Sequence, residues 1–265
     1  MPATRIKTLL ITALAIVFTV ACSPEGNPAS PVLPTILPPG ADNPANPGVS
    51  DDCQNAFLPV KQGASWSYYS AGGPNGDFAY TDTITETQGN EFTLTSQFPN
   101  LTLNQKWLCA PEGLIAQQLG GGTTASVSMQ NMITDFRTLE VSGTSIPKEI
   151  VPGMQWEYHI AIEGSVATPG ESTQSPGTFD LVMQEFGTES VTVPAGTFEA
   201  EKIQATFNAE INVDFQGSPV PYTVNGSSIV WYAPGVGYIK SIENIDFSGT
   251  SFTSVTELQS YSNLP

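Results

Sequence analysis

The sequence is poor in basic residues, histidine and cysteine. Its 265 residues include 8 Lys and Arg against 25 Asp and Glu, with a formal net charge of −17. An excess of negative charge this large repels polyanions, so nucleic acids and anionic lipid surfaces are excluded as electrostatic partners. The only histidine is His159, and no G-x-S-x-G motif occurs. The residues of a catalytic triad are therefore missing, and we expect no enzyme of that kind.

Motifs for metals and cofactors are also missing. No D-x-[DN]-x-[DN]-G calcium loop is present, although the many carboxylates leave a calcium site as a minor alternative. One imidazole and two thiolates make a poor zinc shell. The sequence predicts neither a metal site nor a cofactor.

The longest uncharged apolar run is Thr8–Ala21, which follows Arg5 and Lys7. This run is short for a membrane span and has the length of a signal-peptide core. It ends in Phe18-Thr19-Val20-Ala21-Cys22, which resembles the lipobox of bacterial lipoproteins, where the Cys becomes the lipid-carrying first residue. We predict a lipoprotein signal peptide over residues 1–21 and a lipid on Cys22. The alternative is an ordinary secretory signal with an incidental cysteine.

The segment after this cysteine has the composition of a linker. Residues 23–50 contain eight of the 22 prolines, with Gly, Asn and Ala between them. Such a stretch buries too little apolar surface to offset its ordering entropy. Residues 22–50 are therefore predicted to be a disordered tether. It would hold the domain at the extracytoplasmic side of the bacterial cell envelope, with the membrane as partner through the lipid.

Cys53 and Cys109 remain once Cys22 carries a lipid. Two cysteines in an exported protein indicate a disulfide, because that compartment is oxidising. The bridge would close a long loop and contribute about 4 kcal/mol at most on the chain-entropy account.

Two pairs of matching stretches indicate an internal duplication. In each copy, a Gly-x-x-Trp-x-Tyr opening is followed later by a Trp with a Gly six residues on. We divide the domain, residues 51–265, into copy one at about 55–120 and copy two at about 145–258. The repeated residues, which we expect in the core, are Trp66, Trp107 and Gly113 in copy one and Trp156, Trp231 and Gly237 in copy two.

Period-two alternation dominates the folded part and predicts an all-β protein. The clearest case is 203–215, where apolar residues alternate with polar ones, and turns are expected at Gln88-Gly89-Asn90 and Pro194-Ala195-Gly196. Met129, Met132, Ile133 and Phe136 fall at helical spacing. We expect one short helix there, while alternation at Val127 and Met129 keeps a strand as the alternative.

The run Val193-Pro194-Ala195-Gly196-Thr197-Phe198, followed by Trp231-Tyr232-Ala233-Pro234-Gly235-Val236-Gly237, resembles a group of exported bacterial β-proteins, many of them lipoproteins. The Gly-x-x-Trp-x-Tyr opening belongs to the same pattern. The resemblance implies a large antiparallel sheet curved into an open or partly closed barrel. It is similar in shape to the open barrels of periplasmic lipoprotein carriers, and no assigned activity comes with it.

Three functions fit these observations. The first is a non-enzymatic structural or protein-interaction domain on a lipid anchor. The second is a carrier that holds an apolar ligand in the curved sheet, lined by the inward face of the long strand at Phe207, Ile211 and Phe215. A carboxylate-dependent hydrolase is a distant third, because nothing singles out two of the 25 acidic residues. For the four Trp, we expect core packing ahead of a binding role.

Overall fold

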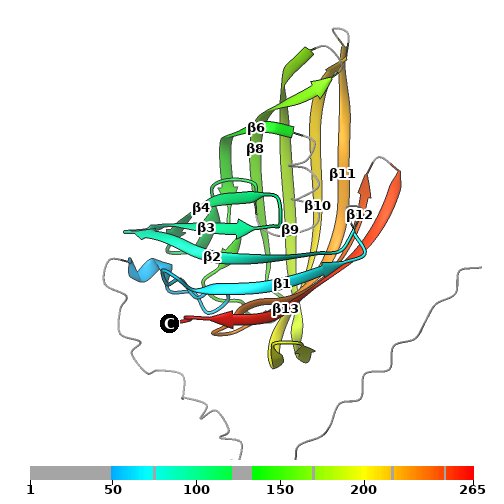
Figure 1. Cartoon of the computed structure of the whole chain (residues 1–265). Helices are drawn as coiled ribbons and strands as arrows, with labels where there is room; N and C mark the ends of the chain where they lie inside the picture. The colour runs from blue at the N-terminus through cyan, green and yellow to red at the C-terminus, as the bar shows by residue number, and fades with distance from the viewer. Residues whose placement is uncertain (1–48, 74–75, 121–132, 169–170, 216–217, 248) are drawn as a thin grey trace, which may run out of the picture. The chain divides into compact units, whose positions relative to one another are not determined.

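One long antiparallel sheet holds all the strands of the computed structural model (Figure 1). The structure describes residues 49–73, 76–120, 133–168, 171–215, 218–247 and 249–265, which belong to one unit, Asn43–Pro265. The predicted signal peptide, Cys22 and the tether up to residue 48 lie outside the described residues. Its last two residues, Val49 and Ser50, already belong to the domain, because Val49 bridges Gly89 and the Ser50 N–H donates to the Gly89 carbonyl oxygen (2.7 Å).

The elements of the described residues are strands and one short 3-10 turn, η1 (Asp51–Cys53). No α-helix occurs in these ranges, in agreement with the predicted all-β class. The strands are β1 (Ser65–Ala71), β2 (Phe78–Gln88), β3 (Glu91–Gln97), β4 (Thr102–Ala110), β5 (Gly113–Ala116), β6 (Ile133–Gly143), β7 (Ile146–Pro147), β8 (Gln155–Thr168), β9 (Glu171–Val193), β10 (Gly196–Phe215), β11 (Ser218–Ala233), β12 (Gly237–Phe247) and β13 (Thr250–Ser262).

The predicted helix is not formed where the structure can be compared with it. Residues 129–132 lie outside the described ranges, and 133–136 begin β6, which pairs with β8. Without β6, the N–H and C=O groups along the outer side of β8 would form an open sheet edge. The helical spacing of four apolar residues was too short a signal to outweigh this pairing, and the strand alternative is correct for 133–136.

The strand order repeats between the two halves of the domain. Strands β1–β5 form one meander and β8–β12 a second, each pairing in sequence order. Trp66 and Trp107 lie on the first and fourth strands of one meander, and Trp156 and Trp231 lie on the first and fourth strands of the other. This topology agrees with an internal duplication. The copy boundaries stay a prediction, which a superposition of the two Trp pairs would test.

Strand β13 joins the two meanders by pairing with β12 on one side and β1 on the other. Figure 1 shows the strands of the first meander running across the direction of β8–β11, so the sheet curves strongly around one concave face. The predicted alternation of β10 is present, since Ile203, Ala205 and Ala209 are buried while Gln204, Thr206 and Asn208 are exposed.

The sheet stays open, with β6 and β7 as its end strands. The short connection between them nevertheless contacts both halves. The Thr144 N–H donates to the Glu157 carbonyl of β8 (2.9 Å), and the Ser145 N–H donates to the Leu114 carbonyl of β5 (3.0 Å). Backbone bonds from one connection thus hold the two ends of the sheet together, which gives the open or partly closed form expected from sequence.

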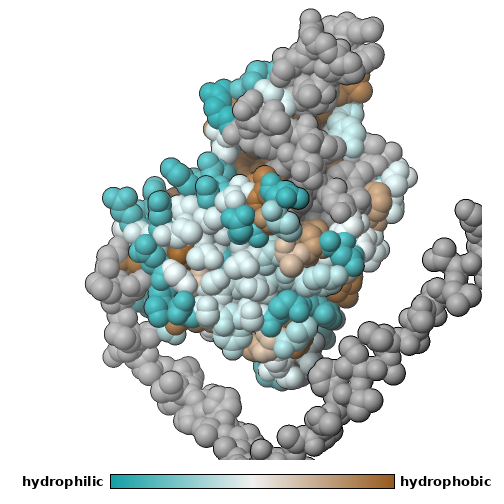
Figure 2. Space-filling model, viewed as in Figure 1, coloured by the Kyte–Doolittle hydropathy of each residue, from teal (hydrophilic) through white to brown (hydrophobic). Residues whose placement is uncertain are grey.

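Hydroxyl side chains pair across the outer face of β1 and β2. Ser65 and Thr83 are hydrogen-bonded across β1 and β2 (3.2 Å), and Ser67 and Thr81 repeat the pair (3.2 Å). Figure 2 shows the surface over β1–β3 as mostly teal and white, with little brown. The apolar side chains of these strands therefore lie on the concave face.

Candidate ligand-binding cavity

The concave face lines a partly open cavity of about 260 Å³. Every strand of the two meanders contributes to its wall. Most of the wall is apolar or aromatic, including Trp66, Leu94, Trp107, Leu181, Met183 and Phe207. The volume is just below the usual range for small-molecule sites, about 300 to 1,000 Å³, and an apolar wall with a few polar groups is typical of them.

Of the three residues predicted to line a ligand, Phe207 lies in the wall of this cavity. Its ring lies over Gly226, its register partner on β11, because a Cβ at Gly226 would overlap that ring. Ile211 is buried but lies outside the cavity wall, in a second apolar cluster with Ala209, Val224 and Ile245. The strand extends past the cavity, and its further inward residues pack on each other. The Phe215 side chain lies outside the described residues.

All four Trp are buried, as expected for core residues. Trp66 and Trp107 also line the cavity, whereas Trp156 and Trp231 do not. Trp107 is held by its neighbour, since its indole N–H donates to Gln105 Oε1 (3.0 Å) and Gln105 Nε2 donates to the Gln118 carbonyl (2.8 Å). Core packing and cavity lining are therefore combined in the first copy.

A row of aromatic rings crosses the wall where the two meanders meet. Tyr68 stacks on Tyr80 (centroids 5.0 Å apart) and is tilted against Tyr238 (5.1 Å), and Tyr238 in turn lies 6.2 Å from Tyr232. The Tyr68 hydroxyl donates to the Tyr238 carbonyl (2.9 Å). Burial, together with the charge of Asp82, raises the pKa of Tyr68 well above its ordinary value, so these phenols stay neutral.

Two carboxylates, Asp82 of β2 and Glu243 of β12, belong to the same wall. They are only 9% and 4% exposed. Asp82 accepts a hydrogen bond from Ser96 Oγ on Oδ1 (2.5 Å), and burial raises the pKa of Asp82 to about 7 against the smaller opposing effect of this bond. Both carboxylates also raise the pKa of Tyr80, which burial raises most. The tyrosine row and the two acids thus form one polar region in an apolar wall.

Neither acid was predicted as a site residue, although the alternation of their strands indicates that both are buried. Asp82 stands at the even position between the buried Tyr80 and Ile84, and Glu243 stands in the same way between Ser241 and Ile245. A carboxylate in the apolar register of a strand must be buried if the register holds. Burial of an acid requires a specific environment, so such positions are functional candidates.

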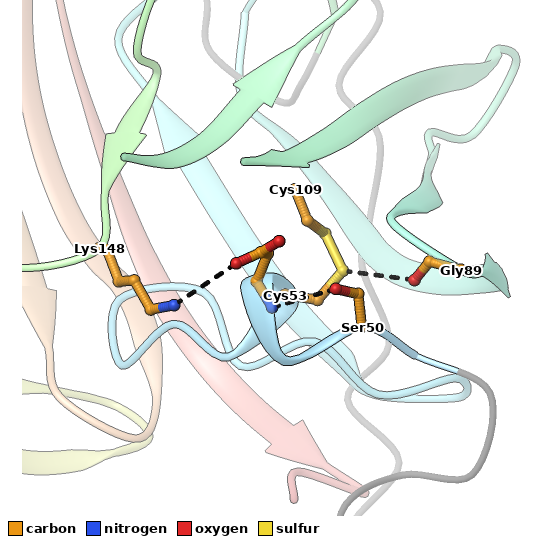
Figure 3. The surroundings of a disulfide bond; sticks show 6 residues. Ser50, Cys53, Gly89, Cys109 and Lys148 are labelled. Atoms are coloured by element: carbon orange, nitrogen blue, oxygen red, sulfur yellow. Dashed lines mark hydrogen bonds and ion pairs between the residues drawn. A yellow bond between two sulfur atoms is a disulfide. The ribbon is translucent and has the colours of Figure 1, made fainter. Parts of the chain in front are cut away.

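Cys53 and Cys109 form the predicted disulfide, with their Cα atoms 4.9 Å apart (Figure 3). It fixes η1 to β4, and Lys148 forms a loose ion pair with Asp52 beside it (3.9 Å). The bridge thus joins the start of the domain to the strand that carries Trp107.

The single histidine does not belong to the cavity. His159 Nδ1 contacts Asp180 Oδ1 (2.6 Å) across β8 and β9, with the imidazole 36% exposed. Within the described ranges, no group of three or more His, Cys, Asp or Glu side chains could hold a metal ion. The same ranges contain no helix that is long and apolar enough to cross a membrane.

Residues 123–263 match the model of a protein family described as DUF3108-like. The fold is similar to the crystal structure of a protein from Bacteroides fragilis described as exported, with a YmcC-like fold (14% identity, 79% of this chain and 100% of that chain, TM-score 0.53). A protein from Parabacteroides distasonis, described as a lipoprotein, is similar over 79% of this chain and 99% of its own (15% identity, TM-score 0.44). No curated protein sequence matches the chain significantly.

Proposed function

The chain belongs to the DUF3108-like family, and we propose that it is a lipid-anchored carrier or binding protein that holds an apolar ligand inside its curved sheet. The observation that carries this proposal is the cavity of about 260 Å³, to which all ten strands of the two meanders contribute. A purely structural or interaction domain, the leading hypothesis from sequence, has no need of an internal space. Such a space forfeits packing contacts.

An envelope location is part of the proposal. The lipobox-like Phe18–Cys22 and the proline-rich tether support it, together with the disulfide, which needs an oxidising compartment. One solved structure of similar fold is described as an exported protein. Changing Cys22→Ala should move the protein from the membrane fraction to the soluble fraction. Continued membrane association would rule out the anchor.

The hydrolase hypothesis gains less support. Glycosidases place two carboxylates across a cleft that admits substrate and water. Asp82 and Glu243 are more than nine-tenths buried, so they do not form an open cleft of that kind. Neither the family description nor the two structures names an enzymatic activity.

Binding of a neutral single-chain probe, 1-decanol, tests the proposal. Trp66 and Trp107 line the cavity, so occupancy should change the tryptophan fluorescence in a saturable way with one site per chain. Ala205→Leu adds bulk to the wall and should weaken binding by about tenfold or more, since a filled site must repack. Thr206→Leu places the same side chain on the neighbouring exposed position and should leave binding unchanged. Absence of saturable binding to the unmodified chain would refute the carrier function.

A further inference from the structure

The charged side chains in the polar region of the cavity wall are all acidic. Asp82 and Glu243 are the two ionisable acids that line the cavity, and none of the described lining residues is Lys, Arg or His. An anionic head group would meet these carboxylates in a site of low dielectric constant, where like charges repel strongly. A ligand with a hydrogen-bond donor or a positive charge would be favoured there.

Two neighbouring polar groups are left for a ligand to contact. Asp82 Oδ1 is used by Ser96, whereas Asp82 Oδ2 accepts no hydrogen bond from the residues in the described ranges. The Tyr80 hydroxyl likewise makes no hydrogen bond within these ranges. Both side chains are more than nine-tenths buried, line the cavity and stand two residues apart on β2.

Neither of these two atoms is among the fully buried atoms without a partner, so both stay accessible from the cavity that their side chains line. One head group in the cavity can therefore contact both. The Asp82 carboxylate can only accept when ionised, and a phenol oxygen can accept or donate. A primary ammonium group carries three donors, so it can satisfy both at once. The rings of Tyr68 and Tyr80 beside it offer faces that also attract cations.

We infer that the ligand is an amphiphile with a short apolar chain and an amine or other donor head group, which binds at Asp82 Oδ2 and the Tyr80 hydroxyl. This inference builds on the proposed carrier function and specifies its ligand class. The apolar chain would lie along the wall formed by Trp66, Leu181 and Phe207. Fatty acids and other anionic amphiphiles of the same length are rejected.

Three probes with the same chain and different head groups test the inference: decylamine, 1-decanol and decanoate. Each is titrated against the full mature chain with Cys22→Ala at about pH 8, above the Asp82 pKa of about 7, so that this carboxyl is ionised. The salt concentration is about 0.15 M, where surface charges are largely screened. We expect decylamine to bind best and decanoate worst. Asp82→Asn should weaken decylamine binding by about 10- to 100-fold, the usual loss for a hydrogen bond to a charged group. It should weaken 1-decanol binding less, because the Asn side-chain oxygen can still accept a hydrogen bond from the alcohol.

Glu86→Gln is the matched control, because it removes one negative charge from an exposed position of the same strand. Its decylamine affinity should equal that of the parent chain. The inference is overturned if decanoate binds as tightly as decylamine, or if Asp82→Asn and Glu86→Gln have equal effects. In either case 1-decanol still binds and the carrier function stands. If none of the three probes binds, the carrier function itself fails.

Discussion

Trp66 donates its indole N–H to the carbonyl oxygen of Val236 (2.6 Å), 170 residues further along the chain. This bond joins β1, the first strand of one meander, to the turn before β12, the last strand of the other. Trp156 lies on the first strand of the other meander, as Trp66 does on its own. Its Nε1 is buried and has no hydrogen-bond partner in the described ranges. Val236 directly precedes Gly237, and Glu112 stands in the same way before Gly113. The Glu112 carbonyl oxygen accepts a hydrogen bond from the Lys148 N–H (3.0 Å). The two meanders therefore pack on each other in similar but unequal ways.

The repeated glycines stand at these contacts between copies. A Cβ at Gly237 would lie 3.4 Å from the Phe57 carbonyl oxygen, and one at Gly113 would overlap the backbone of Ile146 and Pro147. In each case the glycine of one copy receives the segment that leads into the other copy. A glycine is therefore found six residues after the second Trp of each meander because another backbone segment packs close to it.

Gly113→Ala should therefore lower the free energy of unfolding by about 2 to 4 kcal/mol, because backbone must move and the φ of +145° disfavours a side chain. Urea unfolding measures the loss. Gly153→Ala is the matched control, with φ +76° and open space around the Cβ, and should cost about 1 kcal/mol from backbone strain alone. Equal costs for the two variants would contradict the packing account.

Removal of the disulfide should destabilise the domain without changing its fold. The double variant Cys53→Ser and Cys109→Ser frees the loop that the bridge closes, which is worth up to about 4 kcal/mol. Thermal unfolding of the oxidised chain and of the variant gives this difference. Titration of the unfolded, unreduced chain with Cys22→Ala should find no free thiol, and two thiols per chain would disprove the bridge.

Asp82 should make the stability fall as pH rises. Its pKa is about 7 in the folded chain against 3.8 for the ordinary carboxyl, so between these values the folded state holds a proton that the unfolded state has lost. The free energy of unfolding then declines from about pH 4 to pH 7, by at most about 4 kcal/mol for this group, and is flat above.

The pH dependence of the free energy of unfolding, compared between the parent chain and two variants, tests this. Asp82→Asn should remove this part of the decline, whereas Glu86→Gln, on the exposed side of the same strand, should keep it. Parallel pH profiles for the parent chain and Asp82→Asn would show that Asp82 titrates as an exposed acid does.

Gly226→Ala should disturb the cavity through Phe207. The added methyl group would overlap the Phe207 ring and the Asn244 carbonyl, so the ring must leave its place over β11. We expect weaker 1-decanol binding, by about tenfold, together with a stability loss of about 1 to 3 kcal/mol. Gly249→Ala, at a turn with φ +93° and no atom near the Cβ, is the control and should leave the affinity unchanged. Unchanged affinity in Gly226→Ala would place the ligand elsewhere.

The fold class was predictable because its signals are local. The alternation along β10, the turn at Gly89 and the turn at Gly196 each follow from a few neighbouring residues, and the Cys53–Cys109 pair follows from counting. The cavity was not predictable in the same way. Its wall depends on how far the sheet curves, which is set by contacts such as those of Thr144 and Ser145 with both halves. Hence Phe207 lines the cavity and Ile211, four residues on, does not.

As a carrier, this chain should hold an apolar ligand in its cavity when it is isolated. Mass spectrometry of an organic extract tests it most directly, using the mature chain with Cys22→Ala purified from its native compartment without detergent. We predict one small amphiphile per chain, with an amine or another donor head group, and its loss in Ala205→Leu. An extract that contains no stoichiometric apolar molecule, from a chain that is folded and stable, would contradict the account.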